Sequence, residues 1–102
     1  ALYIGGMGAK GKNFYNDLCC RYGFADEAEV VQDAYLDGRR DEAMAALPDE
    51  LIENTTLCGD EAYVIDRLAA YKEAGVTSLN VSPVGGDPAY VLGRLRELAE
   101  HA

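Results

Sequence analysis

The sequence has little positive charge: nine Lys and Arg stand against eighteen Asp and Glu, which gives a net charge of −9. A strongly negative protein repels the phosphate backbone, so this composition excludes general binding to DNA or RNA. Residues 1–25 hold three basic residues and one acid, whereas residues 26–53 hold ten acids and two arginines. Only the N-terminal stretch is therefore predicted to attract an anion.

The sequence also lacks a long apolar run. No stretch approaches the roughly 18 apolar residues that a membrane helix needs, and no signal-peptide pattern is present. We therefore expect a cytoplasmic protein that does not enter a membrane. The chain opens at Ala1 and runs directly into apolar residues, which indicates a start inside a larger protein, with processing of the chain as the alternative explanation.

Residues that usually carry metal or nucleophilic chemistry are few. The three cysteines, Cys19, Cys20 and Cys58, are an odd number, which predicts reduced thiols in a chain without a secretion signal. Adjacent residues on a helix point about 100° apart, so Cys19 and Cys20 are not expected to chelate a metal together. The single histidine, His101, lies beside the last residue of the chain and is predicted to be solvated. No catalytic triad is expected.

Apolar residues recur at helical spacing through most of the chain. The pattern predicts one helix from Phe14 that Gly23 ends, and a second that begins with a capping box of Asp26 and Glu29 and closes at Gly38. Further helices are predicted over residues 39–47, in a short turn at 48–52, after Asp60 as far as Gly75, and after Asp87. The residues expected to face inward in the first half are Phe14, Tyr15, Leu18, Cys19, Tyr22, Val30, Val31, Ala34, Tyr35, Ala43, Met44 and Leu47.

One segment, residues 76–82, is typical of a β-strand and lies between two predicted helices. This order indicates a piece of a parallel α/β architecture, within a chain that is predominantly α-helical. A single strand needs neighbours for its backbone groups. Those neighbours would be short extra strands at Leu2–Ile4 and Thr55–Cys58, strands of a longer protein, or strands of another copy of the chain.

The run from Gly6 to Asn13 matches the spacing of a phosphate-binding loop, but Asn13 stands where Ser or Thr normally binds magnesium. Three interpretations remain open. The loop binds a nucleotide; or it is a tight turn whose two lysines are solvated; or Lys10, Lys12 and the amides of a helix start hold an anionic group of a ligand.

Several segments together resemble the C-terminal part of luciferase-like flavin or deazaflavin oxidoreductases. They are the run from Leu2 to Gly8 with Asn13-Phe14-Tyr15, the Leu47–Leu51 turn, and the stretches Leu57–Asp60, Leu68–Tyr71 and Ala74–Thr77. The Gly-Gly-Met-Gly segment with its following Asn-Phe is the most specific, and it is similar to the branch that uses coenzyme F420.

Members of that family are TIM-type (β/α)₈ barrels several times longer than this chain. The resemblance implies that residues 1–102 are one domain, the C-terminal part of such a barrel. Residues 1–54 would be a helical segment and residues 55–102 the last helix, strand and helix. Ligands of these barrels sit at the C-terminal ends of the strands, which selects the loop from Asn80 to Asp87.

The resemblance implies hydride transfer between reduced coenzyme F420 and an organic substrate, with FMN as the alternative cofactor. It assigns no catalytic residue and no metal ligand to this chain. We expect the chain by itself to be inactive and to hold no cofactor tightly. The residues predicted to lie near the cofactor site are Gly6, Met7, Gly8, Lys10, Lys12 and Asn13.

Two other functions compete with this interpretation. A self-contained helical module that docks a protein partner would be a monomer without exposed apolar surface. A small nucleotide-binding protein would use the loop from Gly6 to Lys12. A part of a barrel would instead expose a core made for the rest of that barrel, so we expect self-association into a homo-oligomer.

Overall fold

The computed structural model describes residues 1–102, which form seven α-helices and no strand. The chain divides into two compact units, Ala1–Thr56 and Leu57–Ala102. That residues 1–102 form one domain with an internal division near residue 54 stays a prediction. None of the helices combines the length and the apolar character that a membrane crossing requires.

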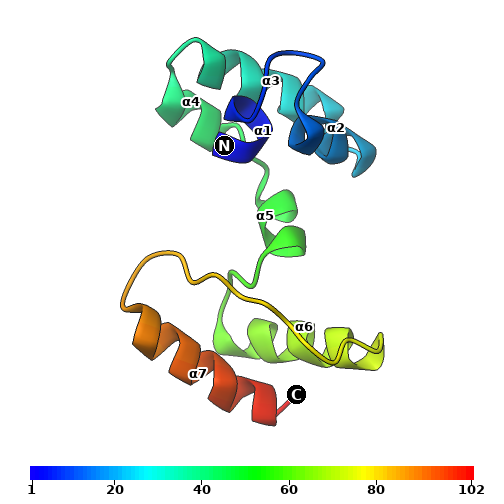
Figure 1. Ribbon diagram of the computed structural model, residues 1–102, viewed down its shortest axis with the longest axis vertical. Helices are drawn as coiled ribbons and strands as arrows, with labels where there is room; N and C mark the ends of the chain where they lie inside the picture. Colours follow the sequence, from blue (N-terminus) through cyan, green and yellow to red (C-terminus); the bar gives the residue numbers. More distant parts are fainter. The chain divides into compact units, whose positions relative to one another are not determined.

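Five helices build the first unit (Figure 1). α3 is central, because it contacts α1, α2 and α4. Its buried residues pack in two clusters, one around Ala28 with Cys19 and Leu51, and one around Val31 and Ala34 with Ala43. The helices are α1 (Leu2–Gly6), α2 (Phe14–Arg21), α3 (Ala25–Leu36), α4 (Arg40–Ala45) and α5 (Asp49–Thr55).

Alanines make up much of the centre of this unit, together with Cys19, Val31 and Leu51. Ala28 and Ala43 are fully buried, and Ala34 is 3% exposed. Helices that meet at alanine can approach closely, so larger side chains beside the contact are left outside. The prediction that five of the apolar residues of this unit face inward is wrong. Tyr15 is 40% exposed, and the others are each more than half exposed, namely Phe14, Tyr22, Val30 and Met44.

The predicted helix ends are mostly confirmed. Gly38 and Gly75 adopt positive φ angles of 80° and 90°, where a side chain would be strained, and the amides that follow turn back to helix carbonyls. Asp60 caps the sixth helix by accepting from the amide of Tyr63, and Asp87 caps the seventh. The capping box at Asp26 is wrong, because α3 begins at Ala25 after Phe24 and no side chain caps it.

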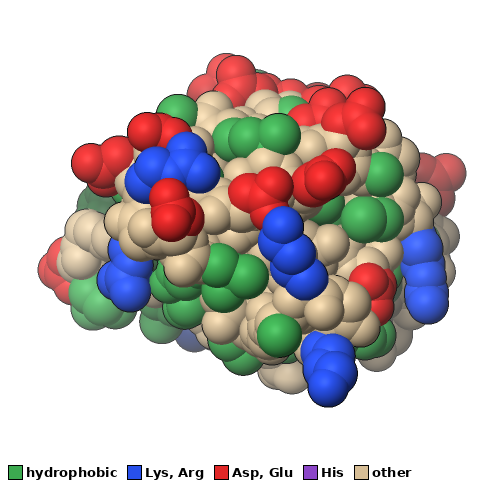
Figure 2. Space-filling view, turned by 90° about the horizontal axis from the view of Figure 1, so that it is seen from above, with side chains coloured by type: hydrophobic (Ala, Val, Ile, Leu, Met, Phe, Trp, Pro, Cys, Tyr) green, Lys and Arg blue, Asp and Glu red, His purple; other side chains and the backbone are tan.

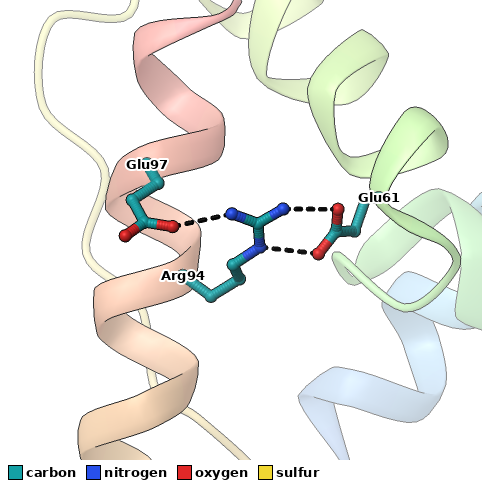
Figure 3. Close-up of polar contacts among 3 residues, drawn as sticks. All are labelled: Glu61, Arg94 and Glu97. Carbon is teal, nitrogen blue, oxygen red and sulfur yellow. Dashed lines mark hydrogen bonds and ion pairs between the residues drawn. The ribbon is translucent and has the colours of Figure 1, made fainter.

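The second unit is a pair of helices, α6 (Glu61–Glu73) and α7 (Pro88–Glu100). Each helix contributes one buried apolar residue, Val64 and Leu98. An ion-pair network reinforces the contact, because Arg94 of α7 donates to both carboxylate oxygens of Glu61 at 2.6 and 2.7 Å (Figure 3). Arg94 also donates to Glu97 of its own helix at 2.6 Å. Two N–H groups on one carboxylate fix the orientation of Arg94.

The predicted strand over residues 76–82 is wrong, because these residues form irregular backbone between α6 and α7. The expected extra strands are wrong as well. Leu2–Ile4 lie in α1, and Thr55–Cys58 end α5 and enter an irregular connection. A strand is stable only when neighbouring backbone satisfies its amides and carbonyls, and these 102 residues provide no such neighbour.

The network at Arg94 predicts a pH dependence. Hydrogen bonding from Arg94 lowers the pKa of Glu61 below its usual 4.5. Folded Glu61 therefore binds fewer protons than unfolded Glu61 at acid pH, so its contribution to stability is present above the unfolded pKa and is lost as pH falls through the folded one. We expect Glu61→Gln to flatten the fall in melting temperature between about pH 5 and pH 3.

Circular dichroism at a series of pH values measures this. Glu73→Gln is the control, because Glu73 is an exposed acid of the same helix without an ion pair, and it should keep the wild-type slope. Equal slopes for Glu61→Gln and wild type would contradict the prediction.

Candidate functional site

The Gly-rich run begins in the last turn of α1 and continues to the start of α2, and its first glycines, Gly5 and Gly6, serve helix packing. A Cβ added to Gly5 would come within 2.5 Å of the Tyr35 Cβ, and one added to Gly6 within 2.4 Å of the Tyr35 Cε1. Both distances are far below van der Waals contact. The glycine pair therefore lets α1 lie directly against α3, which carries Tyr35.

Gly8 is required where the loop folds back on itself. A Cβ at Gly8 would lie 2.3 Å from the carbonyl oxygen of Lys12, a backbone atom that cannot turn away. The amide of Lys12 donates to the carbonyl of Ala9 at 2.9 Å, and the buried Gln32 of α3 donates to the carbonyl of Gly8 at 3.4 Å. The loop is thus closed by its own backbone and tied to α3.

Asn13 is a buried junction between two helices. Its side chain is 1% exposed, and its Nδ2 donates to the carbonyls of Tyr3 and Ile4 in α1 at 2.9 and 3.0 Å. Its Oδ1 accepts from the amide of Asn16 at 3.1 Å and so caps α2. All these polar contacts lie within the chain, which explains why Asn occupies this position.

Sequence reasoning missed Asn16, one turn further along α2. Its Nδ2 donates to the carbonyl of Ile4 in α1 and to the carbonyl of Ala28 in α3, both at 3.0 Å. The available signal was a second Asn three residues after a capping Asn, facing the same side of the helix start. Asn13 and Asn16 together connect α1, α2 and α3.

The remaining members of the predicted group are exposed. Lys10 forms an ion pair with Asp33 of α3, and the hydrogen bond to this carboxylate raises the pKa of Lys10. Lys12 is exposed and has no ion pair, and Met7 is 47% exposed. On the face drawn in Figure 2, isolated basic side chains lie among acidic and apolar ones. Lys12 is therefore the one lysine of the loop whose charge is not already matched.

The surroundings of the loop differ from those of a phosphate-binding loop. That motif follows a β-strand and opens a helix, whereas here the five-residue helix α1 precedes the loop. Asn13 stands at the position that would bind magnesium, and its side chain is already hydrogen-bonded to backbone groups of the chain. The structural context that would support nucleotide binding is absent.

Three aromatic rings form an exposed row next to the loop. The ring centroids of Tyr3 and Tyr15 are 4.9 Å apart, and those of Phe14 and Tyr15 are 5.6 Å apart, both in edge-to-face geometry. Their exposed fractions are 56%, 40% and 66% for Tyr3, Tyr15 and Phe14. Such a row offers apolar surface and ring faces for a planar group.

The second unit offers a shallow groove of about 440 Å³ between its two helices and the irregular segment. Its lining is largely apolar, with Leu68 and Leu79 among the contributors and Lys72 at its side. Cys58 is exposed, and no group of His, Cys, Asp and Glu side chains could hold a metal ion. Burial raises the pKa of the Cys19 thiol, so this cysteine is an inert core residue.

The amino-acid sequence of the chain is similar to that of a known protein family. The family model described as luciferase-like monooxygenase matches residues 1–78. A protein of Mycobacterium tuberculosis, described as "Putative coenzyme F420-dependent oxidoreductase", is 39% identical over 82 residues. The match covers 80% of this chain and 24% of that protein, so the chain spans about a quarter of the length of this relative. No solved structure shows significant similarity to the chain.

The junction at Asn13 yields a stability prediction. Asn13→Ala removes the cap of α2 and leaves carbonyls of α1 without a donor, which should lower the free energy of unfolding by about 2 to 4 kcal/mol. Urea denaturation followed by circular dichroism measures the loss. Lys12→Ala is the control, because the neighbouring Lys12 side chain is exposed and makes no ion pair, and it should change stability by less than about 0.5 kcal/mol. A loss for Asn13→Ala no larger than that for Lys12→Ala would contradict the prediction.

Proposed function

Because the chain belongs to the luciferase-like monooxygenase family, we propose that it serves as part of an F420-dependent oxidoreductase. In that protein, hydride passes between reduced F420 and an organic substrate, with FMN as the alternative cofactor. The observation that carries the proposal is the 39% identity over 82 residues to a protein described as F420-dependent. The chemistry belongs to the cofactor, and the protein binds, orients and excludes water.

The geometry limits what this chain contributes. Gly6, Gly8 and Asn13 hold the helices and the loop together, and Lys10 is paired with Asp33. Only Met7 and Lys12 of the predicted group present free side chains, beside the exposed aromatic row of Tyr3, Tyr15 and Phe14. Lys12 could contact an anionic part of a cofactor, and the aromatic row could contact a planar part. Together they would cover only one side of the cofactor. The chain by itself is therefore proposed to lack tight cofactor binding and turnover.

The remainder of the site is proposed to come from a parent TIM-type barrel. In this arrangement the helical unit of residues 1–56 places its loop beside a cofactor that other segments hold. The cytoplasmic location expected from the composition stays a prediction.

A chimera tests the proposal. The matching segment of the Mycobacterium tuberculosis relative is replaced by this chain's residues, and F420 and FMN are titrated separately by calorimetry. We expect the folded chimera to bind F420 within about tenfold of the affinity of the unaltered relative, while the 102-residue chain alone shows no comparable binding. A folded chimera that binds FMN and not F420 would overturn the F420 assignment, and tight F420 binding to the chain alone would overturn its dependence on other segments.

The two lysines of the loop provide a matched pair within that chimera. Lys12→Ala should weaken F420 binding about threefold to tenfold, because Lys12 carries the unmatched charge that an anionic group could meet. Lys10→Ala should change binding less, because Asp33 already neutralises Lys10. Calorimetry at low and high salt measures both variants, and an equal effect of the two substitutions would contradict a specific role for Lys12.

A further inference from the structure

Gln32 is a polar residue at a buried position of α3. It is 5% exposed and shares the buried face of the helix with Val31 and Ala34. A buried side-chain amide costs free energy unless it finds a hydrogen-bond partner. The Nε2 of Gln32 makes one hydrogen bond, to the carbonyl of Gly8 at 3.4 Å, in the loop between α1 and α2. Contact with this loop therefore accounts for a glutamine in the helix core.

The loop from Gly8 to Lys12 has few other attachments to α3. The middle of the loop is exposed, and no atom of the chain lies within 4 Å of a Cβ built on Gly11. A second attachment is the ion pair of Lys10 with Asp33, in which both side chains are exposed. An exposed ion pair holds a segment only weakly. Gln32 is thus the buried side chain that fixes this loop to the helix core.

The backbone of Gly8 connects Gln32 to Lys12. A Cβ on Gly8 would lie 2.3 Å from the carbonyl oxygen of Lys12 and 3.0 Å from its carbonyl carbon. The two backbones are therefore in direct contact, and a shift of Gly8 is passed on to Lys12. On its other side Lys12 is followed by Asn13, whose side chain is hydrogen-bonded to α1 and caps α2. The Lys12 side chain consequently starts from a backbone that is fixed on both sides.

We propose that Gln32 is a positioning residue, which holds the loop so that the ammonium group of Lys12 meets an anionic group of the cofactor. This rests on the proposed function, which gives Lys12 its anionic partner. Gln32 is buried and acts through Gly8 and Lys12. The contacts that carry the proposal lie within the compact unit Ala1–Thr56, so they do not depend on what surrounds that unit. A loop that is already ordered loses less conformational entropy on binding.

The order of the loop in the chain itself is the first measurement. Gln32→Met keeps the size of the side chain and removes the donor, and Gln32→Asn keeps the amide but is one methylene shorter. NMR order parameters of the amides of residues 9–12 should fall to about 0.6 or lower in both variants. Leu51→Val is the control, because Leu51 is a buried core residue of α5, and it should keep the wild-type values. Unchanged order in both Gln32 variants would overturn the proposal.

Binding of F420 to the chimera is the second measurement. Gln32→Met should weaken binding about threefold and reduce its salt dependence to that of Lys12→Ala, because a displaced ammonium group no longer meets the anion. In a Lys12→Ala background Gln32→Met should have no further effect, since both residues act through one contact. Leu51→Val should lower the melting temperature at least as much as Gln32→Met and leave F420 binding unchanged.

The outcomes separate positioning from a merely structural role. Additive losses in Gln32→Met and Lys12→Ala would show that Gln32 does not act through Lys12, and this would overturn the proposal. An equal loss of affinity in Leu51→Val would also overturn it, because the effect would then be general destabilisation. If the unaltered chimera does not bind F420, the proposed function fails instead, and the order parameters still decide whether Gln32 holds the loop.

Discussion

Two side-chain amides, the buried Asn13 and the partly buried Asn16, connect three helices in the first unit, and the rest of that unit depends on them. Asn13 satisfies carbonyls at the end of α1 and the first turn of α2 at once, and Asn16 joins α1 to α3. Helix α1 has only five residues and could not persist alone. It is held because its last carbonyls find donors on α2 and its glycines lie against Tyr35.

This constraint changes the meaning of the Gly-rich motif. A run of glycines and lysines before a helix suggests anion binding, yet three of its six predicted residues are explained by close packing and backbone capping. The residues left for a ligand are the exposed ones, and they form a surface with an aromatic row beside it. Under the function proposed above, this surface would form one side of a cofactor site that several segments of a longer protein assemble.

The second unit is held together differently. One buried residue from each helix and a bidentate ion pair join α6 to α7. The ion pair is exposed, so it contributes little to the free energy of unfolding. The segment between the helices is left with free backbone groups and partly exposed apolar side chains. Its composition is that of a strand, and its conformation is irregular because pairing needs a second strand that residues 1–102 do not supply.

The sequence by itself determined the helices from α2 to α7, their glycine stops at Gly38 and Gly75, the aspartate caps at Asp60 and Asp87, and the family. These follow from local backbone preferences and from residue patterns that need no distant partner. Only the tertiary structure decided that α1 is a helix, that Phe14 is exposed, that Asn13 and Asn16 form a junction, and that residues 76–82 are not a strand. Each of these depends on which groups meet across the chain, because burial and backbone pairing are properties of contacts and not of a segment alone.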